Sequence, residues 1–595
     1  MTDEPLSINT FYDSQPGGNM LFWIKTIQTA AWFYLLMFAL LAGSAHAAEL
    51  KPADQTGFLI VAADRGFVGN EEIRDAFASF SANHPAALVF VTDERTRQTL
   101  QSGLASLHQQ NIGRIVVLPL FISAAEPRYQ LIRTLVTEEN QTIPVTFTKP
   151  YGESYFAVEA LATRLRGMQH TAQQHLLVVG YGAQNDTHRR AMYDDWMRIV
   201  KQASQGVSFR SINSLILLEA QKDEEPESYG NKTKQQLATA LSSLGTAAKN
   251  NKNQVIAFAL GPKYDSMMSL ESRLERLLPE NAALNHFEIE PQHLAMWMER
   301  EASRNLPLAE EDTGVILFAH GSDFHWNENL RVAVEPLMKR YKIEFAFSMA
   351  DPYTIERALH KLEQRGAKAA IVVSAFASRS SYRNEIGYLA GLDIENQDDH
   401  IHDNNSGHGS HGGHGGHGGH AKSSTPVPRI LTSLPVIWTG GYEDNPLFAS
   451  ALFDRVLALS KDPARETVIL TAHGTQDDRK NDEWLEKLNS IASQMHDQGG
   501  QKFKAFKVAT WREDWPDKRA PWVKKVRAMV TEASKQGDRV IVIPARTTSV
   551  GPEKRFLAGL EFELGEGFAP HPLFTQWVDE QIRQGINLHK EALGH

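Results

Sequence analysis

Two histidines in this chain stand in the same short context, each directly after an apolar run. His320 lies in Ala319-His320-Gly321-Ser322, and His473 lies in Ala472-His473-Gly474-Thr475. A neutral imidazole nitrogen is a ligand for borderline metals, and its ordinary pKa of about 6.5 lets the same ring accept a proton. These two residues are therefore the first candidates for catalysis and metal binding. The alternative for either is a histidine tied to a neighbouring backbone group.

Two further turns share this context without a histidine. The turn at 62–66 follows the apolar run 57–61, and the turn at 180–183 follows 176–179. Aligned by their apolar runs, the four turns place Ala63, Tyr181, His320 and His473 at one position, with spacings of 118, 139 and 153 residues. A repeat of this length is too long for a solenoid and fits a duplicated α/β module.

The segments around each turn predict a parallel sheet. In the first unit, strands are expected at 58–62, 86–91 and 115–121, with an amphipathic helix at 70–77. Continuous apolar strands separated by helical patterns are typical of parallel sheets covered on both faces. The third strand of each later unit is expected at 255–260, 369–376 and 540–544. We therefore predict an α/β fold of four half-units with parallel sheets flanked by helices, arranged as two bilobal domains.

In such sheets, ligands bind outside the carboxyl ends of the strands, which is where the histidine turns are expected. Ser322 and Thr475 follow the histidines and are expected to cap the next helix. Asp323, His325 and Glu328 come next, and His325 and Glu328 share one helix face. They can relay a metal ion toward His320, or the acids can simply belong to a solvated helix start.

Composition excludes several classes of protein. The chain has 595 residues, 42% of them hydrophobic, and a net charge of -10. An acidic chain without a basic stripe is not expected to bind nucleic acid. There is no cysteine, so disulfides, thiolate metal sites and cysteine nucleophiles are impossible.

The N-terminal region is typical of an export signal. Lys25 precedes an apolar run at 30–41, and the small residues of 42–47 end in Ala45-His46-Ala47. This pattern predicts cleavage near Ala47 and an exported, periplasmic protein with no stable membrane span after cleavage. Met20 stands at the right distance to be the start of that signal. The alternative is an uncleaved anchor, although the run is short for a bilayer span.

A histidine-rich segment separates the third and fourth units. Its imidazoles are interspersed with glycine and serine and lie beside Asp398, Asp399 and Asp403; they are His400, His402, His408, His411, His414, His417 and His420. Such a composition predicts a loop without a core and a multidentate site for Zn, Ni, Co or Cu. The alternatives are a polar linker and a store that raises the local metal concentration.

The repeated pattern of apolar strand, His-Gly-Ser or His-Gly-Thr, helix, strand, helix and a further strand resembles the class II chelatases, specifically the sirohydrochlorin cobaltochelatase (CbiX/SirB) family. The most similar stretches are 315–322, 467–475 and 117–124. The resemblance covers nearly the whole chain after residue 47. It implies a lyase of cobalamin or sirohaem synthesis that inserts a divalent metal (Co, Ni, Zn or Fe) into a tetrapyrrole without a nucleotide.

The resemblance implies roles for particular residues. His320 and His473 would be catalytic and would bind the metal, with His325 and the seven histidines of the loop as further ligands. Arg379, Arg383 and Arg546 stand where carboxylates of the tetrapyrrole can dock, although surface ion pairs would explain them equally well. Trp511 and Trp515 can stack on the macrocycle or pack in the core.

The chain departs from the family pattern in one respect. The family has a second histidine in the loop after the third strand, and neither 378–382 nor 546–550 contains one. Either the histidine-rich loop replaces that ligand or insertion activity is gone. The second hypothesis for function is therefore a periplasmic protein that binds or delivers metal on a chelatase scaffold without catalysis.

These observations divide the chain into six expected regions. They are an N-terminal extension with signal peptide at 1–47, degenerate units at 48–170 and 171–305, a third unit at 306–395 and 425–445, the histidine-rich metal-binding loop at 396–424, and a fourth unit at 446–595.

Overall fold

The computed structural model of the chain describes residues 55–92, 95–140, 142–220, 223–245, 252–260, 269–287, 289–392, 427–548 and 551–593. The expected signal segment at 1–47 and the histidine-rich loop at 396–424 lie outside these ranges, and so do all seven candidate histidines of the loop. No helix among the described residues is long and apolar enough to cross a membrane.

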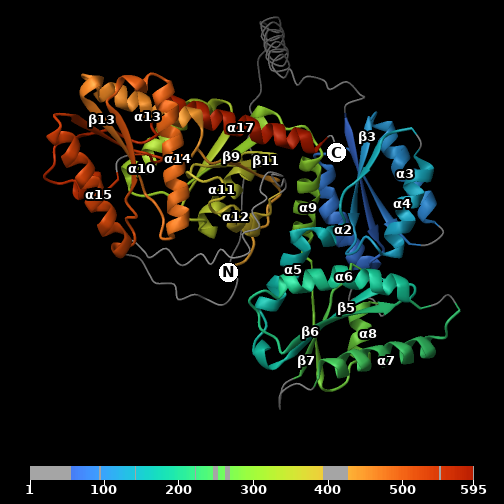
Figure 1. The fold of residues 1–595 in the computed structure, drawn as a ribbon. Helices are drawn as coiled ribbons and strands as arrows, with labels where there is room; N and C mark the ends of the chain where they lie inside the picture. Colours follow the sequence, from blue (N-terminus) through green and yellow to red (C-terminus); the bar gives the residue numbers. More distant parts are fainter. Residues whose placement is uncertain are drawn as a thin grey trace, which may run out of the picture. The chain divides into compact units, whose positions relative to one another are not determined.

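The described residues form four parallel sheets of four strands, each flanked by helices (Figure 1). The strand orders are β2-β1-β3-β4, β6-β5-β7-β8, β10-β9-β11-β12 and β14-β13-β15-β16. The predicted α/β fold class is confirmed. The short fourth strand of each sheet was not expected from the sequence. In every sheet the first strand lies between the second and third, so the strand order reverses beside the turns that follow the first strands.

The first two sheets occupy the N-terminal half of the described chain. The first is built from β1 (Thr56–Ala63), α2 (Gly66–Ser81), β2 (Ala86–Val91), α3 (Thr96–Gln109), β3 (Arg114–Leu120), α4 (Pro127–Glu139), β4 (Val145–Phe147) and α5 (Tyr155–Arg166). The second is built from β5 (His175–Ala183), α6 (Asp186–Ala203), β6 (Ser211–Leu218), α7 (Pro226–Leu244), β7 (Asn253–Ala257), α8 (Leu270–Leu277), β8 (Ala282–Asn285) and α9 (Pro291–Arg304).

The other two sheets follow the same plan. The third is built from β9 (Thr313–Ala319), α10 (Phe324–Val334), β10 (Lys342–Phe347), α11 (Pro352–Gln364), β11 (Ala369–Ser374), α12 (Arg383–Ala390), β12 (Val436–Gly440) and α13 (Pro446–Leu459). The fourth is built from β13 (Glu466–Ala472), α14 (Asp478–Asp497), β14 (Ala505–Thr510), α15 (Pro516–Lys535), β15 (Arg539–Pro544), α16 (Glu553–Phe556), β16 (Glu563–Leu564) and α17 (Pro572–Ala592).

Each central strand is buried because its side chains alternate between two apolar cores. In β1, Phe58 and Ile60 enter a core that also contains Leu176 and Val178 of β5, while Leu59 and Val61 pack against α3 and α4. The third and fourth sheets share a second core in the same way. The sheets are therefore joined in two pairs, and the continuous apolar runs of the sequence reflect burial on both faces.

Helices that end one unit pack against the other unit of the pair. In the N-terminal pair, α5 packs on α6, and α9 packs on α2. In the C-terminal pair, α13 packs on α14, and α17 packs on β11 and β12. Their apolar residues, such as Phe156 of α5 and Trp577 of α17, belong to the shared cores. This exchange of helices packs the two units of each pair around one shared core.

Candidate active site at the histidine turns

The glycine after each histidine gives the turn its shape. Gly321 has a φ of +73°, and a Cβ placed there would lie 2.7 Å from Cβ of Phe347. Gly474 has a φ of +78°, and a Cβ would lie 2.8 Å from Asn481 Oδ1. Only glycine combines this left-handed backbone with so close an approach. The His-Gly pairs therefore reverse the chain sharply and leave the imidazoles at the carboxyl edges of β9 and β13.

The helices after the turns are capped one or two residues later than the sequence predicted. Asp323 accepts from the backbone N–H of Trp326 at 2.9 Å, and Asp477 accepts from that of Lys480 at 2.8 Å. The expectation that Ser322 and Thr475 serve as caps is wrong. A carboxylate at this position satisfies the helix N–H groups and also complements the helix dipole, so the acidic side chain takes the cap.

The imidazole of His320 is exposed and has one nitrogen committed to the backbone. Its Nδ1 lies 2.6 Å from the carbonyl oxygen of Gly321. A carbonyl can only accept, so Nδ1 carries the hydrogen and the neutral ring has its lone pair on Nε2. Within the described part of the chain, no side chain makes a hydrogen bond or ion pair with Nε2. The contact with Gly321 therefore orients the ring of His320 and leaves Nε2 open to a further partner.

The imidazole of His473 has the same backbone contact but a charged neighbourhood. Its Nδ1 lies 2.8 Å from the carbonyl oxygen of Gly474. Its Nε2 lies 2.9 Å from Asp514 Oδ2 and 3.4 Å from Glu513 Oε1. The ring of Trp515 stands edge-on to it, with centroids 5.8 Å apart. Both nitrogens are thus placed to donate hydrogen bonds, which favours the protonated ring.

The surroundings of His473 raise its pKa. Burial alone lowers the pKa, because it penalises the charged ring, but three neighbours outweigh this effect. They are the hydrogen bond to Asp514, the charge of Glu513 and the carbonyl of Gly474, while Arg546 acts weakly in the opposite direction. His473 is therefore arranged to accept a proton and to retain it as a cation.

Arg546 and Arg379 donate hydrogen bonds to protein oxygen atoms. Arg546 holds Glu513 through two nitrogens, at 3.0 and 2.8 Å. Arg379 donates from Nε to the carbonyl of Gly440 at 3.3 Å, and Arg383 is the half-buried first residue of α12. A ligand carboxylate at Arg546 would have to displace Glu513, since that side chain occupies the same face of the guanidinium.

The remaining candidates near His320 are separate side chains at the helix surface. His325 is exposed, and its ring lies 5.6 Å from that of Phe324. Glu328 pairs with Arg331 at 3.1 Å, which fits the alternative of a solvated helix start. Among the residues that the structure describes, no three or more His, Asp or Glu side chains are gathered so that they could hold a metal ion.

Sequence reasoning missed the two carboxylates beside His473. It singled out the stretch 511–515 for its tryptophans, yet Trp511 is buried and donates to Glu553 at 2.9 Å in the core. The strand register explains why Asp514 reaches the histidine: Thr510, the last residue of β14, pairs with Ala472, the last residue of β13. The sequence did contain a signal for them, because Glu513 and Asp514 come three and four residues after the end of β14, a strand adjacent to β13.

The corresponding turns of the N-terminal pair have structural partners. Ala63 is buried, and Asp64 next to it accepts from Asn70 Nδ2 at 2.7 Å. The ring of Tyr181 lies under the guanidinium of Arg273, 4.3 Å from the ring centroid. These contacts stabilise the turns and offer no ring nitrogen to a metal.

Hydrogen bonds and ion pairs between side chains link the two units of each pair. In the N-terminal pair, Ser123 donates to Asp195 at 2.6 Å, and Arg128 forms an ion pair with Glu219. In the C-terminal pair, Lys487 forms an ion pair with Glu443. Neutral hydrogen bonds also link this pair; among them are Tyr442 with Thr547 at 2.8 Å, Thr547 with the carbonyl of Ala375 at 3.0 Å, and Asn329 with Thr548 at 3.2 Å.

Part of the chain is similar to a known family. Residues 66–168 match the family model CbiX. This segment is thus similar to the class II chelatases of the CbiX/SirB type, in agreement with the resemblance at the histidine turns, and it supports, at the level of the family, a chelatase that handles a divalent metal and a tetrapyrrole. The matched segment is the first unit, whose turn carries Ala63 in place of histidine.

Solved structures show similar proteins with low identity. The sirohydrochlorin chelatase SirB from Bacillus subtilis subspecies spizizenii in complex with cobalt is 15% identical, with 40% of this chain and 90% of that chain covered and a TM-score of 0.29. SirB from Bacillus subtilis with Fe3+ is 14% identical, with 39% and 88% covered and a TM-score of 0.28. Identities and TM-scores this low give no information about the activity of this chain. No curated protein sequence matches the chain.

Proposed function

We propose that the protein inserts a divalent metal ion, cobalt in the first place, into a tetrapyrrole such as sirohydrochlorin, and that the C-terminal pair of sheets carries this activity. The observation that supports the proposal is the different surroundings of two equivalent histidines. His320 has an open nitrogen, and His473 is linked to two carboxylates. Insertion requires both a ligand for the incoming metal and an acceptor for the pyrrole protons.

His320 is the proposed contact for the metal ion. The carbonyl of Gly321 fixes the ring so that Nε2 offers its lone pair at the edge of β9. Large apolar side chains are exposed after β9 and β10 at the same edge; they are Phe324 at 71%, Met349 at 51% and Tyr353 at 71%. A flat macrocycle can pack on such side chains while its nitrogens approach the metal.

His473 is the proposed proton acceptor. In its neutral form the ring takes a proton from a pyrrole nitrogen, and Asp514 and Glu513 stabilise the resulting cation. Arg546 holds Glu513 in place through two hydrogen bonds. The proton then leaves to solvent, since His473 remains about one-third exposed at 31%. Its role requires the neutral ring at the start of each cycle, so the activity should fall at low pH.

We further propose that the protein is exported and that the histidine-rich loop collects the metal substrate. The support is the signal pattern ending at Ala47 and the seven imidazoles between His400 and His420. N-terminal sequencing of the protein from the periplasmic fraction tests the first point, with Ala48 as the expected first residue. Full-length chain in the cytoplasmic fraction would contradict export.

The experiment that tests the activity mixes the purified protein, beginning at Ala48, with sirohydrochlorin and Co(II) and follows the absorbance change on metal insertion. The wild type should insert cobalt faster than the uncatalysed reaction. A variant lacking 408–420 should need more Co(II) for the same rate, while His360→Ala, an exposed histidine on α11, should behave as wild type. Wild type that binds Co(II) without accelerating insertion would contradict the enzyme proposal and favour metal delivery.

A further inference from the structure

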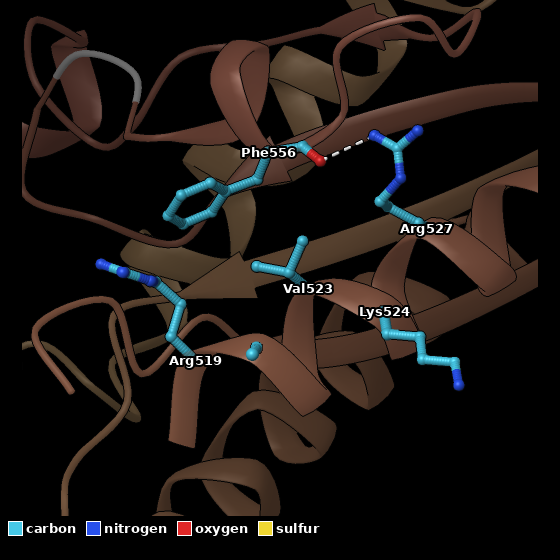
Figure 2. A pocket seen from close by; sticks show the side chains of 6 residues that line it. Arg519, Val523, Lys524, Arg527 and Phe556 are labelled. Atoms are coloured by element: carbon cyan, nitrogen blue, oxygen red, sulfur yellow. Dashed lines mark hydrogen bonds between the residues drawn. The ribbon is translucent and has the colours of Figure 1, made fainter. Parts of the chain in front are cut away.

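A pocket on the outer face of the fourth unit combines an apolar floor with a cationic rim. It has a volume of about 440 Å³ and is lined by Arg519, Ala520, Val523, Lys524 and Arg527 of α15 and by Phe556 of α16. Figure 2 shows Arg519 and Arg527 on either side of Val523, with the ring of Phe556 facing Val523. The helix positions i, i+4 and i+8 place Arg519, Val523 and Arg527 in one row.

The cations of this pocket are not neutralised by carboxylates. Arg519 donates to the carbonyl of Glu513 at 2.9 Å. Arg527 donates to the carbonyls of Phe556 and Ala558 at 2.9 and 3.0 Å. Over the described ranges, neither arginine nor Lys524 forms an ion pair. The backbone contacts hold both guanidinium groups in position and leave further N–H donors of each for a ligand.

The charge of the pocket is local and contrasts with the chain as a whole. Helix α15 carries six Lys and Arg residues and two acids, whereas the whole protein has a net charge of -10. The two acids, Asp517 and Glu532, are not among the lining residues. Three cations without a carboxylate partner around one apolar floor make the local potential positive, which favours an anionic ligand.

We infer that this pocket binds a small organic anion that carries two or more carboxylates on a flat apolar body. Guanidinium groups bind carboxylates through paired N–H donors and also stack on flat rings. Val523 and the ring of Phe556 provide an apolar surface for that body, and the volume lies within the range of small-molecule sites. A bare phosphate would leave the apolar floor uncovered, so the ligand needs both parts.

The test is calorimetric titration of the full protein with benzene-1,3,5-tricarboxylate, citrate and inorganic phosphate as probes. The flat tricarboxylate should bind more tightly than citrate or phosphate. Lys524→Gln and Arg519→Gln should each weaken its binding, by roughly fivefold for a partly exposed charge contact. The matched control is Lys525→Gln, because Lys525 lies over the ring of Trp522 at 4.1 Å, outside the pocket, and should bind as wild type does.

Four results would overturn the inference. The first is equal binding of citrate or phosphate, which would mean that the apolar floor takes no part. The second is equal weakening by Lys525→Gln, which would reduce the effect to general positive charge. The third is loss of binding in Arg379→Gln, a residue of the third unit, which would place the anion at the histidine edge. Absence of any binding would also contradict it.

Discussion

The two halves of the described chain share one fold but differ in what they hold at the equivalent turns. The N-terminal pair has Ala63 and Tyr181 there, and an ion pair between Arg128 and Glu219 links its sheets. The C-terminal pair has His320 and His473, and its sheets are linked by an ion pair between Lys487 and Glu443 and by neutral hydrogen bonds. The family match nevertheless lies in the N-terminal half, at residues 66–168.

In a repeated fold, the copy that matches a family model need not be the copy that carries the candidate catalytic residues. Here the match lies in the first unit, and the candidate histidines lie in the third and fourth. The matched segment shares its strand and helix pattern with the other units, because that pattern is fixed by burial in the cores. The ring nitrogens depend on single residues at an exposed turn, where substitution costs little stability. Four comparisons of paired variants test this difference between the two halves.

The largest effect is expected for His320→Ala. Removal of the open Nε2 should lower the rate of cobalt insertion by roughly 100-fold, a loss comparable to that of a positioned catalytic side chain. Tyr181→Phe, at the aligned position of the N-terminal pair, should leave the rate unchanged. Initial rates of the absorbance change measure both. If Tyr181→Phe lowered the rate as much as His320→Ala, the C-terminal assignment would fail.

The second comparison concerns Asp514→Asn, which removes a charge that raises the pKa of His473. With a lower pKa, the ring stays neutral to lower pH, so the acid limb of the pH–rate profile should move to lower pH. The rate at the optimum should fall by about tenfold, as for other partners that orient a functional histidine. Asp517→Asn, an exposed acid nearby, should leave the profile unmoved. An unshifted limb in Asp514→Asn would contradict the role of His473.

The third comparison concerns stability in the N-terminal pair. Burial raises the pKa of Glu126 to about 7, although it accepts from the backbone N–H groups of Ile122 and Ser123. Between the ordinary value of 4.5 and about 7, the folded state holds a proton that the unfolded state has lost. Stability should therefore fall as pH rises through this window, by at most about 1.4 kcal/mol per pH unit.

Glu126→Gln should remove this slope, because the amide keeps both acceptor contacts without a charge. Denaturant unfolding at several pH values between 4.5 and 7 measures it. Glu443→Gln is the comparison in the C-terminal pair, where burial also raises the pKa of the half-buried carboxyl but the neighbouring Lys487 opposes this effect, so a smaller part of the slope should be lost. A slope that persisted unchanged in Glu126→Gln would show that other groups govern the pH dependence.

The smallest effect is expected at the turn glycines. Gly321→Ala puts a side chain at a positive φ and against Phe347, which should cost about 1–2 kcal/mol of unfolding free energy. Gly230→Ala, within α7 with no atom within 4 Å of its Cβ, should instead stabilise by about 0.5–1 kcal/mol. Urea unfolding compares them. Equal stability of both variants would mean that the turn geometry is not required.

The sequence was sufficient for the central strand of each sheet and for the position of the histidines, but not for the short fourth strands. Burial on both faces gives β1 and β9 an apolar pattern without interruption, and a His-Gly pair after such a run marks a sharp turn. The sequence did not predict which side chains lie beside those histidines. Asp514 meets His473 because of the register between β13 and β14, which no local pattern encodes. The acid in the corresponding loop after β10, Asp351, caps α11 by accepting from the backbone N–H of Thr354 at 3.1 Å, so the two histidines differ in their neighbours.

The candidate arginines likewise show that side-chain partners could not be predicted from the sequence. The spacing of Arg546 relative to the strands placed it correctly at the carboxyl edge, but its partner could not be read from the sequence. Glu513, which accepts both of its hydrogen bonds, comes from a loop 33 residues earlier in the chain. Side chains that meet through the fold of a parallel sheet are separated by whole helices, so their pairing depends on tertiary structure.

The exchanged helices have a consequence for how such a chain can be divided. Helix α5 closes the first unit in sequence, yet Phe156, Leu161 and Leu165 lie in the core that this unit shares with the second. A fragment ending after α5 would present that apolar face with nothing to cover it and would associate with a second copy of itself. Each half of the protein is thus built from two sequence repeats that share one core.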